Sequence, residues 1–291
     1  MIVKRVILFM KKIFISASDG YQLSALYATP VGSSCGTAII SSATGIKKEF
    51  YIHFAKYLVQ HGYNVLLYDY RGVGESSPKG MVKTDAFMHD WGILDMNAVL
   101  NYMVFEKGHK EIIWVGHCIG AQLTGFLRNT QYVKKVIAVN AASGYWGYLP
   151  FPRRAIAWIF SYMVSPLLLK LYGYGSLGKE DMDKNIPKNV YQEWQHWCKS
   201  KNYYQQFLTD HFNTDKFYNF RIPVTSVYTS DDYMANFKTA QSILNFYPNA
   251  PSRIIKLQVE RYTEYKVGHA GIFRKKFHRD LWTELMSLID S

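Results

Sequence analysis

The stretch from residue 111 to residue 129 constrains the fold more than any other part of the chain. It starts with residues that favour a strand, continues through a pentapeptide with Gly116 and Gly120 at its ends and Cys118 at its centre, and becomes a helical pattern near Ala121. A strand that runs directly into a helix needs a sharp turn, and the two glycines remove Cβ atoms that would collide there. The stretch therefore predicts a strand, a strained turn with Cys118 at its tip, and a helix.

A cysteine at the tip of such a turn has distinctive chemistry. It lies at the N-terminus of a helix, where the positive end of the helix dipole favours the thiolate. With a histidine beside it, a thiolate and an imidazolium could pair before a substrate arrives. Cys118 is therefore predicted to be a covalent nucleophile. The alternative is a small buried cysteine in a catalytically silent protein that only binds a ligand.

The rest of the chain alternates short runs of β-branched residues with amphipathic stretches. This pattern is typical of an α/β fold with a mostly parallel sheet and helices on its faces. Strands are predicted at residues 12–17, 23–28, 37–42, 64–70, 111–115, 135–140, 223–229 and 253–259. Helices are predicted at residues 50–61, 84–105, 118–129, 236–246 and 272–289.

Between residues 142 and 221 the alternation stops. This segment is rich in Trp and Tyr, has helical periodicity and contains no strand candidate. We therefore expect a core formed by residues 1–142 and 222–291, with a helical lid inserted at 143–221. Its most apolar part, residues 155–172, is shorter than the ~20 residues that a membrane span needs, so we interpret it as lid helices. Transient contact of the lid with a membrane is the alternative.

Charge and cysteine usage narrow the partners. The 291 residues carry a formal net charge of +12, but no run of five basic residues occurs. With no basic stripe interleaved with stacking aromatics, we expect a small-molecule acyl substrate rather than nucleic acid, and the oligomeric state stays open. The three cysteines are far apart, which favours a reducing, cytoplasmic location. The histidines show no ligand spacing, so neither a metal nor a cofactor is expected.

Polar residues follow the last two predicted strands. Asp231 and Asp232 come after residues 223–229, and His269 comes after residues 253–259. An acid and then a histidine, in this chain order, complete a site built on a nucleophile turn. We therefore expect His269 to be the base and Asp232 the acid. Asp232 is preferred to Asp231 because it lies four residues before the start of the next helix, and the other aspartate is expected to stabilise a turn.

An acyl-transfer site also needs N–H donors for the developing oxyanion and a pocket for the substrate. One donor is expected to be Ile119, the residue after the nucleophile, and the other Ile46 in the loop after residues 37–42, with Gly45 as the alternative. Trp194 and Trp197 lie three apart on a helical pattern. They are candidates to line the substrate pocket, or else only to pack the lid onto the core.

Two other polar features are expected to be structural. His117 precedes the nucleophile, and its neighbour's geometry should direct it away from the pocket into hydrogen bonds of the core. Residues 69–72, with the sequence Asp-Tyr-Arg-Gly, follow a central strand. Their Asp and Arg are expected to hold that loop by hydrogen bonds.

With these motifs in place, the chain resembles the α/β-hydrolase superfamily, and closely its bacterial group of hydrolases related to serine aminopeptidase and lysophospholipase-like enzymes. The resemblance covers nearly the whole chain. It rests on residues 43–45 with Phe50 and Tyr51, and on residues 68–76, 116–120, 187–198 and 268–271.

The resemblance implies a metal-free hydrolase with a nucleophile, an acid, a histidine and an inserted lid. Members of the group resemble serine enzymes, so Cys118 is a departure, similar to the cysteine of dienelactone hydrolases and polyhydroxyalkanoate synthases. We therefore expect hydrolysis of an ester or thioester through an acyl-enzyme on Cys118. The alternative activity is that of an acyltransferase or thioesterase that passes the acyl group to an acceptor other than water.

Overall fold

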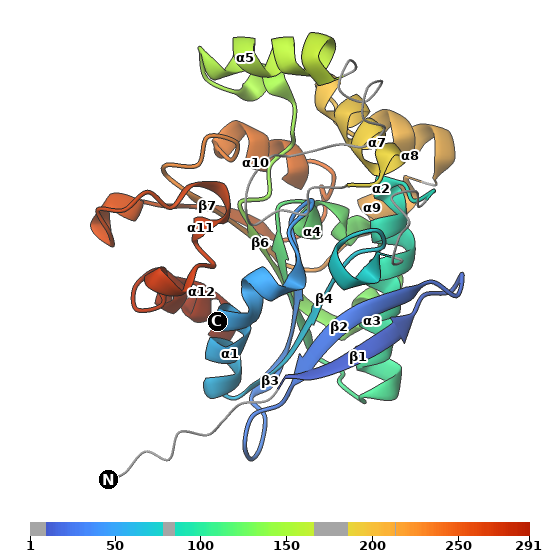
Figure 1. The fold of residues 1–291 in the computed structure, drawn as a ribbon, viewed down its shortest axis with the longest axis vertical. Coiled ribbons are helices and arrows are strands. Elements are labelled where there is room, and N and C mark those ends of the chain that lie inside the picture. Colours follow the sequence, from blue (N-terminus) through green and yellow to red (C-terminus); the bar gives the residue numbers. More distant parts are fainter. Residues whose placement is uncertain (1–9, 78–84, 166–185, 213) are drawn as a thin grey trace.

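The computed structural model describes residues 10–77, 85–165, 186–212 and 214–291, and its centre is one eight-stranded sheet (Figure 1). The strand order is β1-β2-β4-β3-β5-β6-β7-β8. β2 runs antiparallel to β1 and β4, and all other neighbours are parallel. Each predicted strand is present, with its ends displaced by two residues at most. The strands are β1 Lys11–Ser16, β2 Gln22–Ala28, β3 Gly36–Ser41, β4 Tyr63–Tyr68, β5 Ile112–His117, β6 Val133–Val139, β7 Val224–Thr229 and β8 Ser252–Leu257.

Helices cover both faces of the sheet, and the strands alternate their side chains between the two (Figure 1). Ile39 and Trp114 join the cluster that packs under α3 and α10, whereas Ile40 and Val115 join the cluster under α1 and α12. The α-helices are α1 Ile52–Gln60, α2 Met88–Asp90, α3 Met96–Asn101, α4 Ile119–Gln122, α5 Arg153–Ile159, α7 Lys188–Lys199, α8 Gln205–His211, α9 Asp215–Tyr218, α10 Phe237–Leu244, α11 Gly268–Gly271 and α12 Leu281–Asp290. The central strands β3, β4 and β5 are therefore buried on both sides, as expected of a parallel sheet covered by helices, whereas β8 at the edge is partly exposed.

Three predicted helices differ from those observed. The helix expected at residues 118–129 is α-helical only from Ile119 to Gln122 and continues as a 3₁₀ helix, Leu123–Phe126. The helix expected at residues 84–105 runs from Met88 to Glu106 and contains two π-helical segments, Trp91–Asp95 and Tyr102–Glu106. Residue 84 lies outside the described residues. The helix expected at residues 272–289 starts only at Leu281, because the extended backbone of Arg274 (ψ 139°) interrupts it.

The described parts of the segment between β6 and β7 consist of helices joined by turns and loops. In Figure 1 α7 and α8 lie close to α2, whereas α5 stands away from the sheet. α7 is anchored to α2 because the Glu193 carboxylate accepts the backbone N–H of His89 (3.0 Å) and contacts its Nδ1 (2.7 Å). The predicted lid boundaries at 143 and 221 stay a prediction.

The helical segment after β6 exposes apolar side chains. Ile156 and Met163 are each 63% exposed, and part of the apolar stretch 155–172 lies outside the described residues. No helix in the described ranges combines the length and the apolar character needed to cross a membrane. Contact of the lid with a membrane surface therefore stays a prediction.

Candidate active site

Cys118 lies directly after β5, at the carboxyl edge of the sheet, on the strained turn that the sequence predicted. Its backbone has φ 51° and ψ −116°, a combination that costs a residue with a Cβ about 1–3 kcal/mol. A Cβ on Gly116 would lie 2.5 Å from Ala121 N, and a Cβ on Gly120 would lie 2.3 Å from Ser41 O. The two glycines are therefore required by space, and the surrounding contacts hold Cys118 in its unusual conformation.

The acid and the histidine meet as predicted from their order along the chain. His269 lies on α11, after β8, and its Nδ1 is 2.7 Å from Oδ2 of Asp232, which follows β7. The other carboxylate oxygen of Asp232 accepts the Met234 N–H at 2.8 Å. Because Nδ1 donates to the carboxylate, Nε2 is the ring nitrogen left to face Cys118. Cys118 interacts electrostatically with this imidazole, as the raised pKa of His269 shows.

Asp231 has a different task from its neighbour. Its carboxylate accepts the backbone N–H of Val267 at 2.7 Å and that of Gly268 at 3.0 Å. These bonds tie the loop after β7 to the loop that carries the histidine. Asp231 therefore stabilises the backbone, and Asp232 contacts the imidazole.

The electrostatics of this cluster favour a charged imidazole. Burial disfavours the imidazolium, but the neighbouring Cys118 and Asp232 outweigh that cost and raise the pKa of His269 from 6.5 to about 10. The largest favourable contribution is the charge of Cys118. The arrangement is thus suited to an imidazolium held between a carboxylate and a thiolate.

Two side chains hold the backbone of His269. Its carbonyl oxygen accepts Nδ2 of Asn140 at 2.6 Å and lies 3.0 Å from Nε2 of His117. Because a carbonyl only accepts, His117 must donate through Nε2, and its Nδ1 then accepts the Tyr51 hydroxyl at 2.7 Å. Burial, followed by the charge of His269, lowers the pKa of His117 well below 6.5, which agrees with this neutral form. His117 therefore points into core hydrogen bonds, as expected.

The turn after β3 differs from the expectation in one donor. The Ile46 N–H donates to the Ala43 carbonyl at 3.0 Å, and Gly45 has φ 70°, so residues 43–46 form a type II turn. This bond occupies the N–H that was expected to face the substrate. The N–H groups of Thr44 and Gly45 have no hydrogen-bond partner within the described ranges, and the buried Thr44 hydroxyl also has none.

The two tryptophans of α7 have separate surroundings. Trp197 is buried among aromatic rings, with centroids 5.8 Å from Tyr203 and 5.4 Å from Tyr204. Trp194 is only partly buried and hydrogen bonds with the Tyr203 side chain. Trp197 therefore packs the segment between β6 and β7 onto the core, and Trp194 lies nearer to the surface.

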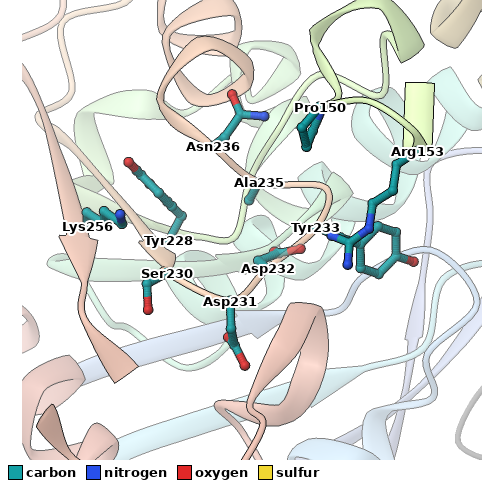
Figure 2. Close-up of a pocket in the computed structure, with 10 residues that line it drawn as sticks. All are labelled: Pro150, Arg153, Tyr228, Ser230, Asp231, Asp232, Tyr233, Ala235, Asn236 and Lys256. Carbon is teal, nitrogen blue, oxygen red and sulfur yellow. The ribbon is translucent and has the colours of Figure 1, made fainter. Parts of the chain in front are cut away.

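A cavity of about 420 Å³ borders the acid (Figure 2). It is lined by Pro150, Arg153, Tyr228, Ser230, Asp231, Asp232, Tyr233, Ala235, Asn236 and Lys256. The Arg153 guanidinium lies over the Tyr233 ring, 5.3 Å from its centroid. Since neither Cys118 nor His269 lines this cavity, it opens beside the acid rather than onto the sulfur. It shows that the chain after β6 reaches the loop that carries Asp232.

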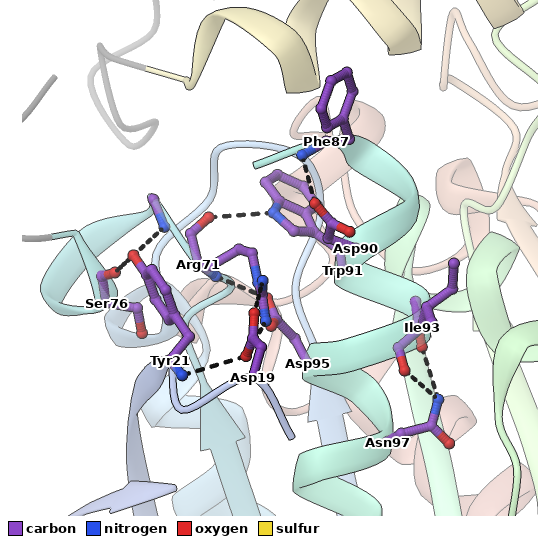
Figure 3. A network of polar contacts seen from close by, with 12 residues as sticks. Asp19, Tyr21, Arg71, Ser76, Phe87, Asp90, Trp91, Ile93, Asp95 and Asn97 are labelled. Atoms are coloured by element: carbon purple, nitrogen blue, oxygen red, sulfur yellow. Dashed lines mark hydrogen bonds and ion pairs between the residues drawn. The ribbon is translucent and has the colours of Figure 1, made fainter. Parts of the chain in front are cut away.

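The loop after β4 has the structural role that was expected of it. Arg71 donates from Nε to Asp95 at 2.7 Å and from Nη1 to Asp19 at 2.7 Å, while its carbonyl accepts the Trp91 indole N–H (Figure 3). Asp69 accepts the backbone N–H and the ammonium of Lys48, at 2.7 and 2.6 Å. These contacts join the loop to the turn between β1 and β2, to the short 3₁₀ helix that precedes α1, and to the helix that begins at α2.

One group of carboxylates in the described part of the chain is close enough to hold a metal ion: Glu49, Asp69 and Glu75. The Lys48 ammonium lies among them, at 2.8, 2.6 and 2.8 Å respectively. The Lys48 ammonium therefore already occupies the position between these carboxylates that a cation would take. The donor set therefore does not favour a cation.

Comparison with known proteins places this geometry in a family. Residues 33–260 match the model of the family described as serine aminopeptidase, S33. The chain belongs to this family. It is an α/β-hydrolase, and in a family described by a serine enzyme it carries Cys118 at the tip of the strained turn after β5.

Solved structures show the same fold at low identity. A thermostable carboxyl esterase from Bacillus coagulans is 12% identical, with a TM-score of 0.64 and coverage of 97% of this chain and 98% of that one. An esterase from Exiguobacterium antarcticum is 16% identical, with a TM-score of 0.60 and coverage of 97% and 100%. A thermophilic esterase from Thermogutta terrifontis is 10% identical, with a TM-score of 0.58 and coverage of 96% and 98%. The search of curated proteins gave no match.

Sequence reasoning missed two residues that shape the site. Asn140 follows β6 with φ 48° and bonds the His269 carbonyl, and an Asn directly after a buried strand was the available signal. Gln122 lies on α4, one turn after Cys118, and its Nε2 is 3.7 Å from the sulfur. Gln122 could be recognised as a polar residue among small and apolar ones, but nothing in the sequence pattern indicated that it contacts Cys118.

Proposed function

We propose that this protein hydrolyses carboxylic esters or thioesters through an acyl intermediate on Cys118, with His269 as acid and base and Asp232 orienting the imidazole. The observation that carries the proposal is the strained Cys118 turn beside a histidine whose pKa its neighbours raise to about 10. The family, and the similar solved structures whose titles call them esterases, support ester hydrolysis.

In the first step, Sγ of Cys118 attacks the carbonyl carbon of the substrate and a C–S bond forms. The carbonyl oxygen takes the displaced electron pair and becomes an oxyanion. When the tetrahedral intermediate collapses, the bond to the leaving oxygen or sulfur breaks. His269 gives its Nε2 proton to that group, so an alcohol or a thiol leaves and a thioester remains on Cys118.

In the second step, His269 takes a proton from water while the water oxygen attacks the thioester carbonyl. The C–S bond then breaks, the acid leaves and the thiolate is restored. Because a thioester keeps more acyl-transfer potential than an ester, an alcohol or amine acceptor in place of water would turn the same site into an acyltransferase.

We assign the oxyanion donors to the N–H groups of Ile119 and Thr44. Ile119 is the first residue of α4, where N–H groups have no partner within the helix. Thr44 replaces Ile46 because the Ile46 N–H closes the turn, while the Thr44 N–H has no partner in the described part of the chain. Gly45 remains the alternative donor.

We further propose that residues 143–221 act as a lid. Two contacts support this role: Tyr203 donates its hydroxyl to Gln122, next to the nucleophile, and Arg153 lines the cavity beside Asp232. Trp194, partly buried near Tyr203, is the better of the two tryptophans for contact with an acyl group, because Trp197 is enclosed by aromatic rings.

The test compares the wild type with Cys118→Ala and, as a matched control, Cys198→Ala, which removes another buried thiol. An alkyl ester and an acyl-CoA are supplied in parallel, with and without an added alcohol acceptor. Cys118→Ala is expected to lower kcat by about 10³-fold or more, and Cys198→Ala by less than about tenfold. Mass spectrometry of the quenched wild type should find the acyl group on the peptide that contains Cys118.

Full activity in Cys118→Ala would overturn the proposal. If instead the wild type hydrolyses neither substrate, Cys118 resists an iodoacetamide probe at neutral pH and Cys118→Ala keeps its affinity for ligands, the protein is a binding protein. A product on the added alcohol would assign it to acyl transfer.

A further inference from the structure

We propose that Gln122 is a positioning residue for the nucleophile: its amide NH₂ donates to Sγ of Cys118, orients the sulfur and favours the thiolate. This inference rests on the proposed function of Cys118 and adds a residue that neither the family motif nor the sequence pattern marks. Nε2 of Gln122 lies 3.7 Å from Sγ of Cys118 and 2.7 Å from the carbonyl oxygen of Ala142.

Three contacts fix the orientation of the Gln122 amide. Its Oε1 can only accept, and it takes the Tyr203 hydroxyl at 2.8 Å. Its two N–H groups then face two acceptors, the Ala142 carbonyl and Sγ of Cys118. In the flipped amide, an oxygen would face the Ala142 carbonyl oxygen and an NH₂ would face the Tyr203 hydroxyl. The observed orientation therefore satisfies every polar atom of a side chain that is only 1% exposed.

The residue that holds the amide comes from the segment between β6 and β7. Tyr203 lies between α7 and α8, is buried, and has φ 51°, which is rare for a bulky side chain. It packs on Trp197 and Tyr204, with ring centroids 5.8 and 5.1 Å away. The surrounding aromatic rings thus hold Tyr203 in a strained conformation that places its hydroxyl on Gln122.

The position of the Gln122 amide favours the thiolate form of Cys118 over the thiol form. A thiol is a poor acceptor, whereas a thiolate accepts N–H groups well, so a fixed NH₂ beside Sγ stabilises the thiolate more than the thiol. Gln122 contacts the sulfur from α4, and His269 on α11 interacts with Cys118 electrostatically. The sulfur therefore lies between two donors. The His269 imidazole gives up its proton during the reaction, whereas the Gln122 amide keeps its protons.

The test measures the rate of iodoacetamide alkylation of Cys118 against pH, in a Cys35→Ser background that removes the exposed cysteine. Four proteins are compared: the parent, Gln122→Met, Tyr203→Phe and Tyr204→Phe. Tyr204→Phe is the matched control, because its hydroxyl donates to the backbone oxygen of Gln122 at 2.9 Å and not to the side chain. Mass spectrometry of the labelled peptide confirms that Cys118 is the residue modified.

Gln122→Met is expected to move the midpoint of alkylation upward by about one pH unit, since it removes a hydrogen bond to a charged group. Tyr203→Phe should move it by about half as much, because the amide keeps its NH₂ but loses one constraint. Tyr204→Phe should leave it unchanged. kcat for an ester should fall in the same order at a pH below the parent midpoint.

Two results would contradict the inference while leaving the proposed function intact: Gln122→Met with the parent midpoint, or equal shifts in Tyr203→Phe and Tyr204→Phe. The second comparison decides the question even if Gln122→Met does not fold. If parental Cys118 is not alkylated at neutral pH and Cys118→Ala retains activity, the proposed function fails first and the inference fails with it.

Discussion

Two charged clusters with buried centres, both in the described part of the chain, have opposite characters. In the first, Lys48 lies among Asp69, Glu49 and Glu75, and the Asp69 carboxylate accepts both the N–H and the ammonium of Lys48. In the second, the Asp232 carboxylate accepts His269 Nδ1–H and the Met234 N–H, and the imidazole of His269 interacts electrostatically with Cys118. Both clusters lie at the carboxyl edge of the sheet, after strands β4 and β7.

The difference lies in which atom remains reactive. In the Lys48 cluster each charge faces an opposite charge, and the pKa of Lys48 is raised because Asp69 outweighs the effect of burial. In the Cys118 cluster both carboxylate oxygens of Asp232 accept hydrogen bonds, whereas the Cys118 sulfur has no charged group at salt-bridge distance in the described residues and accepts the Gln122 amide at 3.7 Å. Around Lys48 every charge has an opposite partner, and the cluster stabilises a loop. At Cys118 the sulfur has no such partner, and in the proposed function it can therefore form a bond to a substrate.

The largest expected effect separates the two adjacent aspartates. Asp232→Asn should lower kcat by about 10³- to 10⁴-fold, because an amide cannot stabilise the imidazolium and favours the wrong tautomer. Asp231→Asn keeps an acceptor for the Val267 and Gly268 N–H groups and should lower kcat by less than about tenfold. Steady-state kinetics of both variants on one ester make the comparison. Equal losses would mean that Asp232 is not the acid.

The second prediction concerns how much the Lys48 cluster contributes to the free energy of unfolding. Lys48→Met strands a buried Asp69 carboxylate and should lower the free energy of unfolding by about 3–5 kcal/mol. Lys12→Met is the matched control, because Lys12 bonds the same Glu75 carboxylate at 2.6 Å but is 47% exposed. That surface pair should contribute about 0–1 kcal/mol. Urea denaturation measures the free energy of unfolding of both variants. Equal losses in the two variants would contradict the comparison.

A third prediction concerns the N–H groups that face the oxyanion. Thr44→Pro removes the Thr44 N–H, and proline suits the second position of a type II turn. We expect kcat to fall by about 10²-fold with little change in melting temperature. Thr44→Ala keeps the N–H and should stay within about threefold of the wild type. An active Thr44→Pro would transfer the role to Gly45.

The smallest effect is the pH dependence of stability. The pKa of His269 is raised from 6.5 to about 10, so its proton stabilises the fold fully below about pH 6.5 and progressively less as pH rises towards 10. Between pH 7 and pH 10 the free energy of unfolding should fall by roughly 1–2 kcal/mol more in the wild type than in His269→Gln. Urea titrations at a series of pH values measure both slopes, and parallel slopes would show that His269 is not held as the imidazolium.

Much of this molecule could be predicted from local patterns. The eight strands follow from runs of β-branched residues, and Cys118 follows from a strand, two glycines and a helix within a few residues. The pairing of His269 with Asp232 followed from chain order, because parallel strands bring their following loops to one edge of the sheet. Local cues failed near Arg274, where burial of the neighbouring Phe273 and Phe277 accompanies a break in the expected helix.

The sequence by itself therefore determined the kind of sheet, the position of the nucleophile turn and the residues that could serve it, because these depend on neighbours along the chain. Only the tertiary structure decided which N–H of the turn after β3 is unoccupied, which aspartate holds the loop, and that Gln122 meets both Tyr203 and Cys118. Hydrogen bonds act over about 3 Å, and their partners here lie up to 81 residues apart, so no local pattern can specify them.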